Sequence, residues 1–77
     1  MRRQLEVRLN KPTLIDELMT YLRSLGHTVM EAGYGTLHVE LAAEERARLE
    51  FHLTIWEAVR SLEHAGVRAE IVGEPPE

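Results

Sequence analysis

The 77-residue chain contains no cysteine, so disulfide bonds and thiolate metal sites are excluded. Positive charge is also scarce, because Lys11 is the single lysine and the formal net charge is −4. A nucleic-acid-binding domain needs clustered positive charge to neutralise phosphates, and Arg2-Arg3 is the only adjacent basic pair. We therefore expect no nucleic-acid partner.

Long apolar runs are absent as well. No run approaches the roughly 20 residues of a membrane-spanning helix. Arg2 and Arg3 are not followed by the apolar segment of a signal peptide. Together with the lack of cysteine, these features favour a cytoplasmic protein that has no membrane partner.

Alternating apolar and polar residues predict strands at 4–9, 36–41 and 67–71, each with one buried face. A further strand is expected at 27–32, before the turn Gly33-Tyr34-Gly35. Its register has two alternatives. A two-residue Gly33-Tyr34 loop buries Met30, whereas a three-residue loop buries Val29 and turns Glu31 inward. We favour the first, because an inward unpaired glutamate is costly.

Two helices are expected between these strands. The first begins at Thr13, whose side chain is expected to cap it with Asp16 in a capping-box position, and it ends at Gly26. Its apolar face is formed by leucines at helical spacing: Leu14, Leu18, Leu22 and Leu25. The second helix is expected over 42–65. If continuous, it is about 36 Å long and overhangs a sheet whose strands span about 20 Å.

The second helix carries two apolar groups on a helical wheel. One is expected to cover the sheet: Phe51, Ile55, Ala58, Val59 and Leu62. The other group comprises Leu49, Leu53 and Trp56, and its centre lies more than about 100° away on the wheel. Its i, i+4, i+7 spacing suits a helix-packing ridge, and tryptophan is enriched at binding hot spots. We expect Leu49, Leu53 and Trp56 to form an interface, the alternative being an edge of the core.

The element order is β-α-β-β-α-β. Right-handed crossovers then place both helices on one face of a four-stranded antiparallel sheet of order 4-1-3-2, the α+β ferredoxin-like plait. We expect one domain over 1–73 and a polar tail over 74–77. The other sheet face is expected to be polar and held by ion pairs, with these residues: Glu6, Arg8, His38, Glu40, Arg68 and Glu70.

This order and length resemble small ferredoxin-like modules, including ACT-type regulatory domains. The resemblance implies dimerisation and small-ligand binding near the loop after the first strand, often through a glycine. Here that loop reads Asn10-Lys11-Pro12-Thr13 and has no glycine.

No residue pattern names a reaction. Ser24 and Ser61 have no identifiable histidine partner, and the histidines lack metal-ligand spacing: His52 and His64, for example, lie about 18 Å apart on one helix. We therefore expect no enzyme, no metal and no cofactor. The leading hypothesis is an interaction module, most simply a homodimer, otherwise one that binds another protein through the long helix. The alternative is a small-ligand sensor, with its ligand beside Asn10-Lys11 or between protomers.

Overall fold

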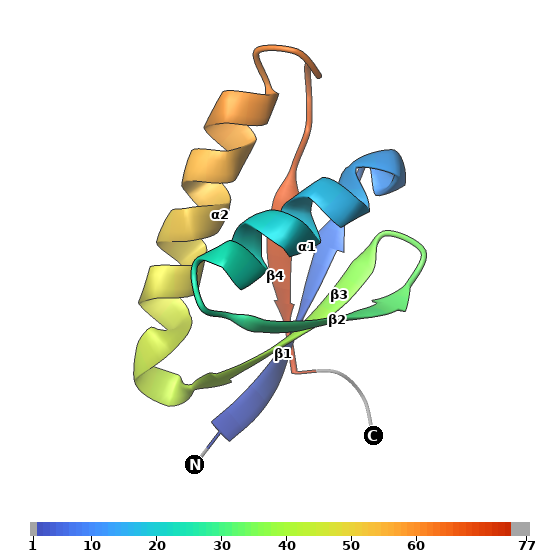
Figure 1. Ribbon diagram of the computed structural model, residues 1–77. Helices are drawn as coiled ribbons and strands as arrows, with labels where there is room; N and C mark the ends of the chain where they lie inside the picture. Colours follow the sequence, from blue (N-terminus) through green and yellow to red (C-terminus); the bar gives the residue numbers. More distant parts are fainter. Residues whose placement is uncertain (1, 75–77) are drawn as a thin grey trace.

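A computed structural model describes residues 2–74 as a four-stranded sheet with two α-helices packed on it (Figure 1). Short 3-10 helices, η1 and η2, precede α1 and α2. The elements are β1 (Arg2–Leu9), η1 (Pro12–Leu14), α1 (Ile15–Ser24), β2 (Thr28–Gly33), β3 (Thr36–Ala42), η2 (Ala43–Glu45), α2 (Arg46–Arg60) and β4 (Ala69–Gly73). Of the predicted tail over 74–77, residues 75–77 lie outside the described residues.

The strand order is β2-β3-β1-β4, and every pairing is antiparallel. The predicted order 4-1-3-2 is therefore confirmed. The central strands β1 and β3 place their apolar residues opposite one another, as in the pair Val7 and Leu37. Since alternate side chains in a strand point to opposite faces, this register gives the sheet one apolar face.

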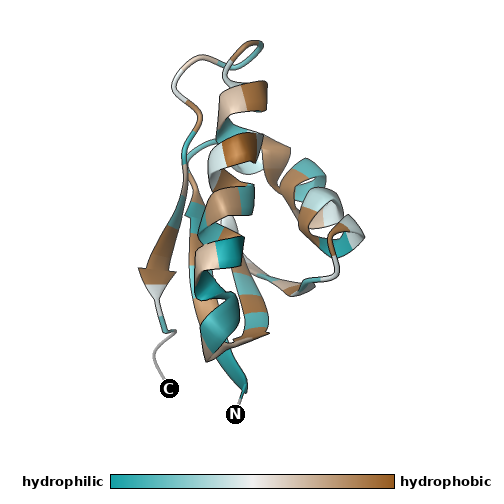
Figure 2. Cartoon of the chain, turned by 90° about the vertical axis from the view of Figure 1, so that its left-hand side faces the viewer, coloured by the Kyte–Doolittle hydropathy of each residue, from teal (hydrophilic) through white to brown (hydrophobic). Residues whose placement is uncertain are grey.

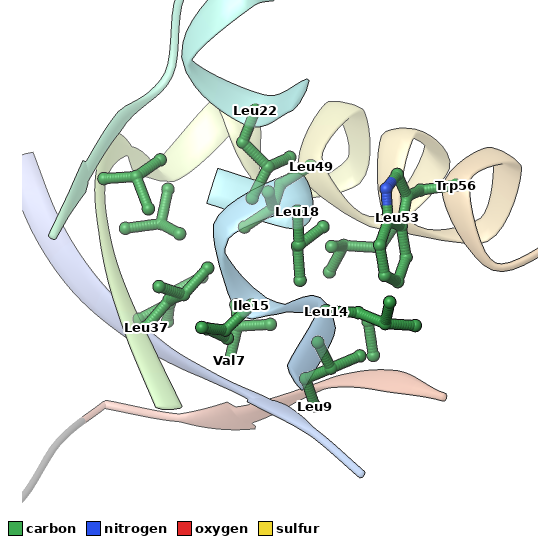
Figure 3. Close-up of a cluster of buried hydrophobic side chains, with 14 of the residues drawn as sticks. Val7, Leu9, Leu14, Ile15, Leu18, Leu22, Leu37, Leu49, Leu53 and Trp56 are labelled. Atoms are coloured by element: carbon green, nitrogen blue, oxygen red, sulfur yellow. The ribbon is translucent and has the colours of Figure 1, made fainter. Parts of the chain in front are cut away.

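Both helices cover that apolar face. Leu18 and Leu22 of α1 meet the sheet residues Val7 and Leu37 in one buried cluster, to which α2 also contributes (Figure 3). The opposite sheet face is polar and carries ion pairs, as predicted. Glu6 forms an ion pair with Arg8 at 3.0 Å on this face, and the His38 ring lies 3.7 Å from the same carboxylate.

The β2–β3 turn corrects the predicted register. Val29 is buried and Met30 is exposed, the reverse of the favoured alternative. The turn residues are Tyr34 and Gly35, and Gly35, not Gly33, takes a positive φ of 73°. An alanine Cβ at Gly35 would come within 2.9 Å of the Leu9 carbonyl oxygen, so a close backbone approach also requires glycine there.

The start of the first helix also differs from the prediction. Thr13 makes no side-chain capping hydrogen bond, because it lies inside the 3-10 turn that Pro12 begins. A carboxylate supplies the comparable contact before α2, where Glu45 Oε1 accepts the backbone N–H of Ala42 at 2.9 Å.

The second helix is shorter than the continuous 42–65 alternative. It begins as η2, continues as α2 over 15 residues, or about 22 Å, and then turns. The turn is held by Ser61, whose hydroxyl donates to the Ala58 carbonyl at 2.9 Å. Gly66 follows with a φ of 81°. The helix is therefore not continuous over 42–65, and the condition for a length of about 36 Å is not met.

Candidate functional site

Helix α2 has two apolar faces, and the structure buries the one that the wheel assigned to an interface. Leu49, Leu53 and Trp56 lie in the chain's own core, with Trp56 only 3% exposed. Figure 3 shows all three beside Leu18 of α1. We name Leu49, Leu53 and Trp56 the inner ridge. Because these side chains are covered within one chain, the predicted orientation of the helix was wrong and they are not exposed anchors.

The face expected to cover the sheet instead points outward. Phe51 is 62% exposed, Val59 is 51% exposed and Leu62, in the turn after α2, is 85% exposed. Ile55 lies between Phe51 and Val59 and is also exposed. We name Phe51, Ile55, Val59 and Leu62 the outer stripe. In Figure 2, which looks onto α2 from outside, apolar bands dominate the half of the helix nearer its C-terminal end.

Three polar contacts near the N-terminal end of α2 orient the helix. The backbone N–H of Ala42 is held by Glu45, as described above. Arg48 Nη2 donates to the Leu25 carbonyl at 3.3 Å, and His52 meets His27. The contacts of Arg48 and His52 join α2 to the segment after α1, and they accompany the orientation in which the inner ridge faces the core, whereas the Glu45 contact is local to the start of the helix.

The His27–His52 contact is a hydrogen bond between two imidazole rings. His27 Nε2 lies 2.9 Å from His52 Nδ1, and the ring planes are inclined at 71°. His27 is 7% exposed, whereas His52 is half-buried and stands beside Phe51, with ring centroids 6.1 Å apart. The pair therefore connects the buried segment after α1 with the border of the outer stripe.

Burial and positive neighbours favour the neutral form of both imidazoles by lowering their pKa values. Desolvation lowers the pKa of His27 most, and the charges of His52 and Arg48 lower it further against an opposing effect of Glu45. The pKa of His52 is also lowered, first by desolvation and then by Arg48. A positive ring at either position loses hydration and meets another cation, which explains both directions.

Three polar residues of η2 and α2, Glu45, His52 and Arg60, lie at different sites. Glu45 and His52 belong to the contacts that orient α2. Arg60 reaches Glu17 of α1 at 3.8 Å, and its Nε is buried without a hydrogen-bond partner. Arg60 therefore lies at the seam between the helices, on the inner side of α2.

A hollow of about 520 Å³ lies where the end of β1 meets the β2–β3 turn and the start of β4. It is lined by Arg8, Leu9, Asn10, Tyr34, Gly35, Thr36, Arg68 and Glu70. Asn10 has a structural role here. Its Nδ2 donates to the Gly66 carbonyl at 2.8 Å, and its Oδ1 accepts the Arg68 N–H at 2.7 Å. Asn10 thus anchors the segment before β4.

Within residues 2–74, no three His, Cys, Asp or Glu side chains are grouped so that they could hold a metal ion. None of the helices in that range combines the length and apolar character needed to cross a membrane. Comparisons of the chain with protein-family models, curated proteins and solved structures found no match.

Proposed function

We propose that this protein is a non-enzymatic interaction module of the cytoplasm that forms a homodimer through the outer stripe of α2. Its β-α-β-β-α-β order and strand arrangement suit a ferredoxin-like plait, in which helices on one sheet face leave an outer helical surface for a partner. The exposure of Phe51, Ile55, Val59 and Leu62 on one side of the chain carries this proposal.

The outer stripe has the spacing of a helix-packing surface. Phe51, Ile55 and Val59 recur every four residues, which forms one ridge along the helix. Ala47 and Ala58 are exposed close to this ridge on the wheel, and their small side chains allow another backbone to approach. Exposed apolar residues that occur singly need no explanation, but a contiguous row on a chain this small favours a partner.

A second copy of the chain is the occupant that we propose, because the stripe is self-complementary. A two-fold axis at Ile55 sets two α2 helices antiparallel, so that Phe51 of each copy faces Val59 of the other.

Two valines of equal exposure provide a matched test. Val59 on the outer stripe and Val72 on β4 are each 51% exposed. Val59→Lys places a charge in the proposed apolar contact. Light scattering after gel filtration is expected to give twice the 8.8 kDa chain mass for wild type and Val72→Lys, and the single mass for Val59→Lys.

Two results of this experiment would overturn the homodimer. One is a monomeric wild type at concentrations of tens of micromolar. The other is an equal loss of mass in both lysine variants, because the contact would not then be specific to α2. Circular dichroism of each variant checks that the chain remains folded.

Small-ligand sensing is a second candidate, favoured by the hollow beside Asn10. Its volume of about 520 Å³ falls in the range of ligand pockets. Arg8 and Arg68 supply guanidinium donors for a carboxylate or phosphate, although Arg8 is already paired with Glu6. A thermal-shift screen with amino acids and nucleotides tests this function, because a ligand that binds the native state raises the melting temperature. Arg68→Gln is expected to abolish such a shift, whereas Val59→Lys is expected to retain it.

A further inference from the structure

The His27–His52 pair links two parts of the chain that are far apart in sequence. His27 follows Gly26 at the end of α1, and its N–H donates to the Leu22 carbonyl at 3.1 Å. His52 lies on α2. Their 2.9 Å ring contact and the Arg48–Leu25 hydrogen bond together attach the segment after α1 to the N-terminal half of α2.

Whether the two rings can form a hydrogen bond depends on how many protons they carry. With both rings neutral, one nitrogen donates its N–H and the other accepts it. One added proton can preserve that bond. When both rings are protonated, both nitrogens carry N–H groups, neither accepts, and two positive charges face each other.

The surroundings add to this sensitivity. Arg48 on α2 and Glu45 on η2 are the charged groups whose fields act on His27, and Arg48 acts on His52. His27 is nearly covered by the protein, so it gains little hydration when it becomes charged. His52 is half-buried, so it can turn toward solvent, and it lies beside Phe51 of the outer stripe.

We propose that the His27–His52 pair is a proton-sensitive clasp that holds the N-terminal half of α2 in place at neutral pH and, when it opens in mild acid, weakens self-association through the outer stripe. This regulation rests on the proposed homodimer. Opening releases His52 as a cation at the border of the apolar contact, where a buried charge is unfavourable.

The sign of the pH effect on stability follows from the lowered pKa of both histidines. The pKa of a histidine in the unfolded chain is about 6.5. Below that pH the unfolded chain binds protons that the folded chain does not. The contribution to stability is therefore complete above about pH 6.5 and is lost as the pH falls through the lower folded-state pKa values.

The clasp is tested first without the dimer, in the Val59→Lys background. Urea unfolding is expected to show a lower midpoint at pH 5 than at pH 8. His52→Gln is expected to reduce this difference, because glutamine can still hydrogen-bond to His27 but does not become charged. His64→Gln, a matched change outside the pair, is expected to leave the difference intact. NMR titration of the imidazole C–H signals should place both paired histidines below the ordinary value.

The association step is then tested by sedimentation at both pH values and constant ionic strength. We expect the wild-type dissociation constant to rise about tenfold at pH 5, an effect of about 1.4 kcal/mol, and to change little in His52→Gln.

Ordinary pKa values in the titration, or equal effects of the two glutamine changes, overturn the clasp and leave the homodimer untouched. A working clasp with a pH-independent dimer overturns the regulation alone. A wild type that is monomeric at both pH values overturns the homodimer and its regulation together, while the titration still reports on the clasp.

Discussion

The two faces of α2 are similar in composition and opposite in environment. The inner ridge of Leu49, Leu53 and Trp56 is buried against α1 and the sheet, whereas the outer stripe of Phe51, Ile55, Val59 and Leu62 is exposed. Hydrophobicity alone does not separate them, because the exposed face carries more apolar residues. Contacts outside the helix, from His52 and Arg48 to the segment after α1, distinguish the faces.

This difference assigns separate roles to one helix. The inner ridge is expected to contribute to the free energy of unfolding of the single chain, because its side chains leave water when the chain folds. The outer stripe contributes little to that quantity, since its side chains remain in water after folding. Its apolar surface contributes a favourable free energy only when another surface covers it.

Truncation of the inner ridge is expected to have the largest effect on stability. Trp56→Ala removes a side chain that is 3% exposed and leaves a cavity between α1 and α2, at a cost of about 3–5 kcal/mol in the free energy of unfolding. Urea denaturation followed by circular dichroism measures this loss. Trp56→Phe is a second, milder variant, for which a smaller loss in the same direction is expected. An Ala variant as stable as wild type would show that Trp56 is not a core residue.

Truncation of the outer stripe is expected to have a much smaller effect on the single chain. Phe51→Ala changes a side chain that is 62% exposed, so the free energy of unfolding at low protein concentration should stay within about 0.5 kcal/mol of wild type. At higher concentration, wild type should gain melting temperature through association, and the variant should gain less. A loss as large as that of Trp56→Ala would reverse the assignment of the two faces.

The strand order could be predicted from the sequence because strand and helix periodicities identify the elements and their apolar faces, and right-handed crossovers then arrange those elements. Leu5 and Val7 alternate with charged residues in β1, and Leu18 and Leu22 recur at helical spacing in α1. These patterns place the same residues in the core in the structure. Each pattern was sufficient there because only one face of the element was apolar.

The orientation of α2 could not be predicted in the same way. A helical wheel gives the angle between Trp56 and Phe51 but does not state which one faces the sheet. The orientation involves contacts between residues far apart in sequence, such as the one between His27 and His52. Neither histidine stood out from the others, because a two-residue pair across 25 positions leaves no spacing motif.

The β2 register was mispredicted for a related reason. The sequence argument treated an inward Glu31 as buried and therefore costly. Glu31 pairs with Leu37 in the sheet, yet it remains exposed, because β2 is an edge strand and its side chain has access to water. Burying Val29 instead of Met30 therefore carries no buried-charge penalty.

Arg48 offers the smallest and most specific test of what separates the two faces. Arg48→Met retains most of the apolar length of the side chain but removes the donor to Leu25 and the positive charge near both histidines. Stability at pH 8 should change by no more than about 0.5 kcal/mol. The pKa of each histidine should rise only part of the way toward its ordinary value, because burial is the leading cause of the lowered pKa at both positions and persists in the variant. NMR titration of the two rings measures both shifts. Unchanged pKa values would place Arg48 away from the pair and remove one of the contacts that orient the inner ridge toward the core.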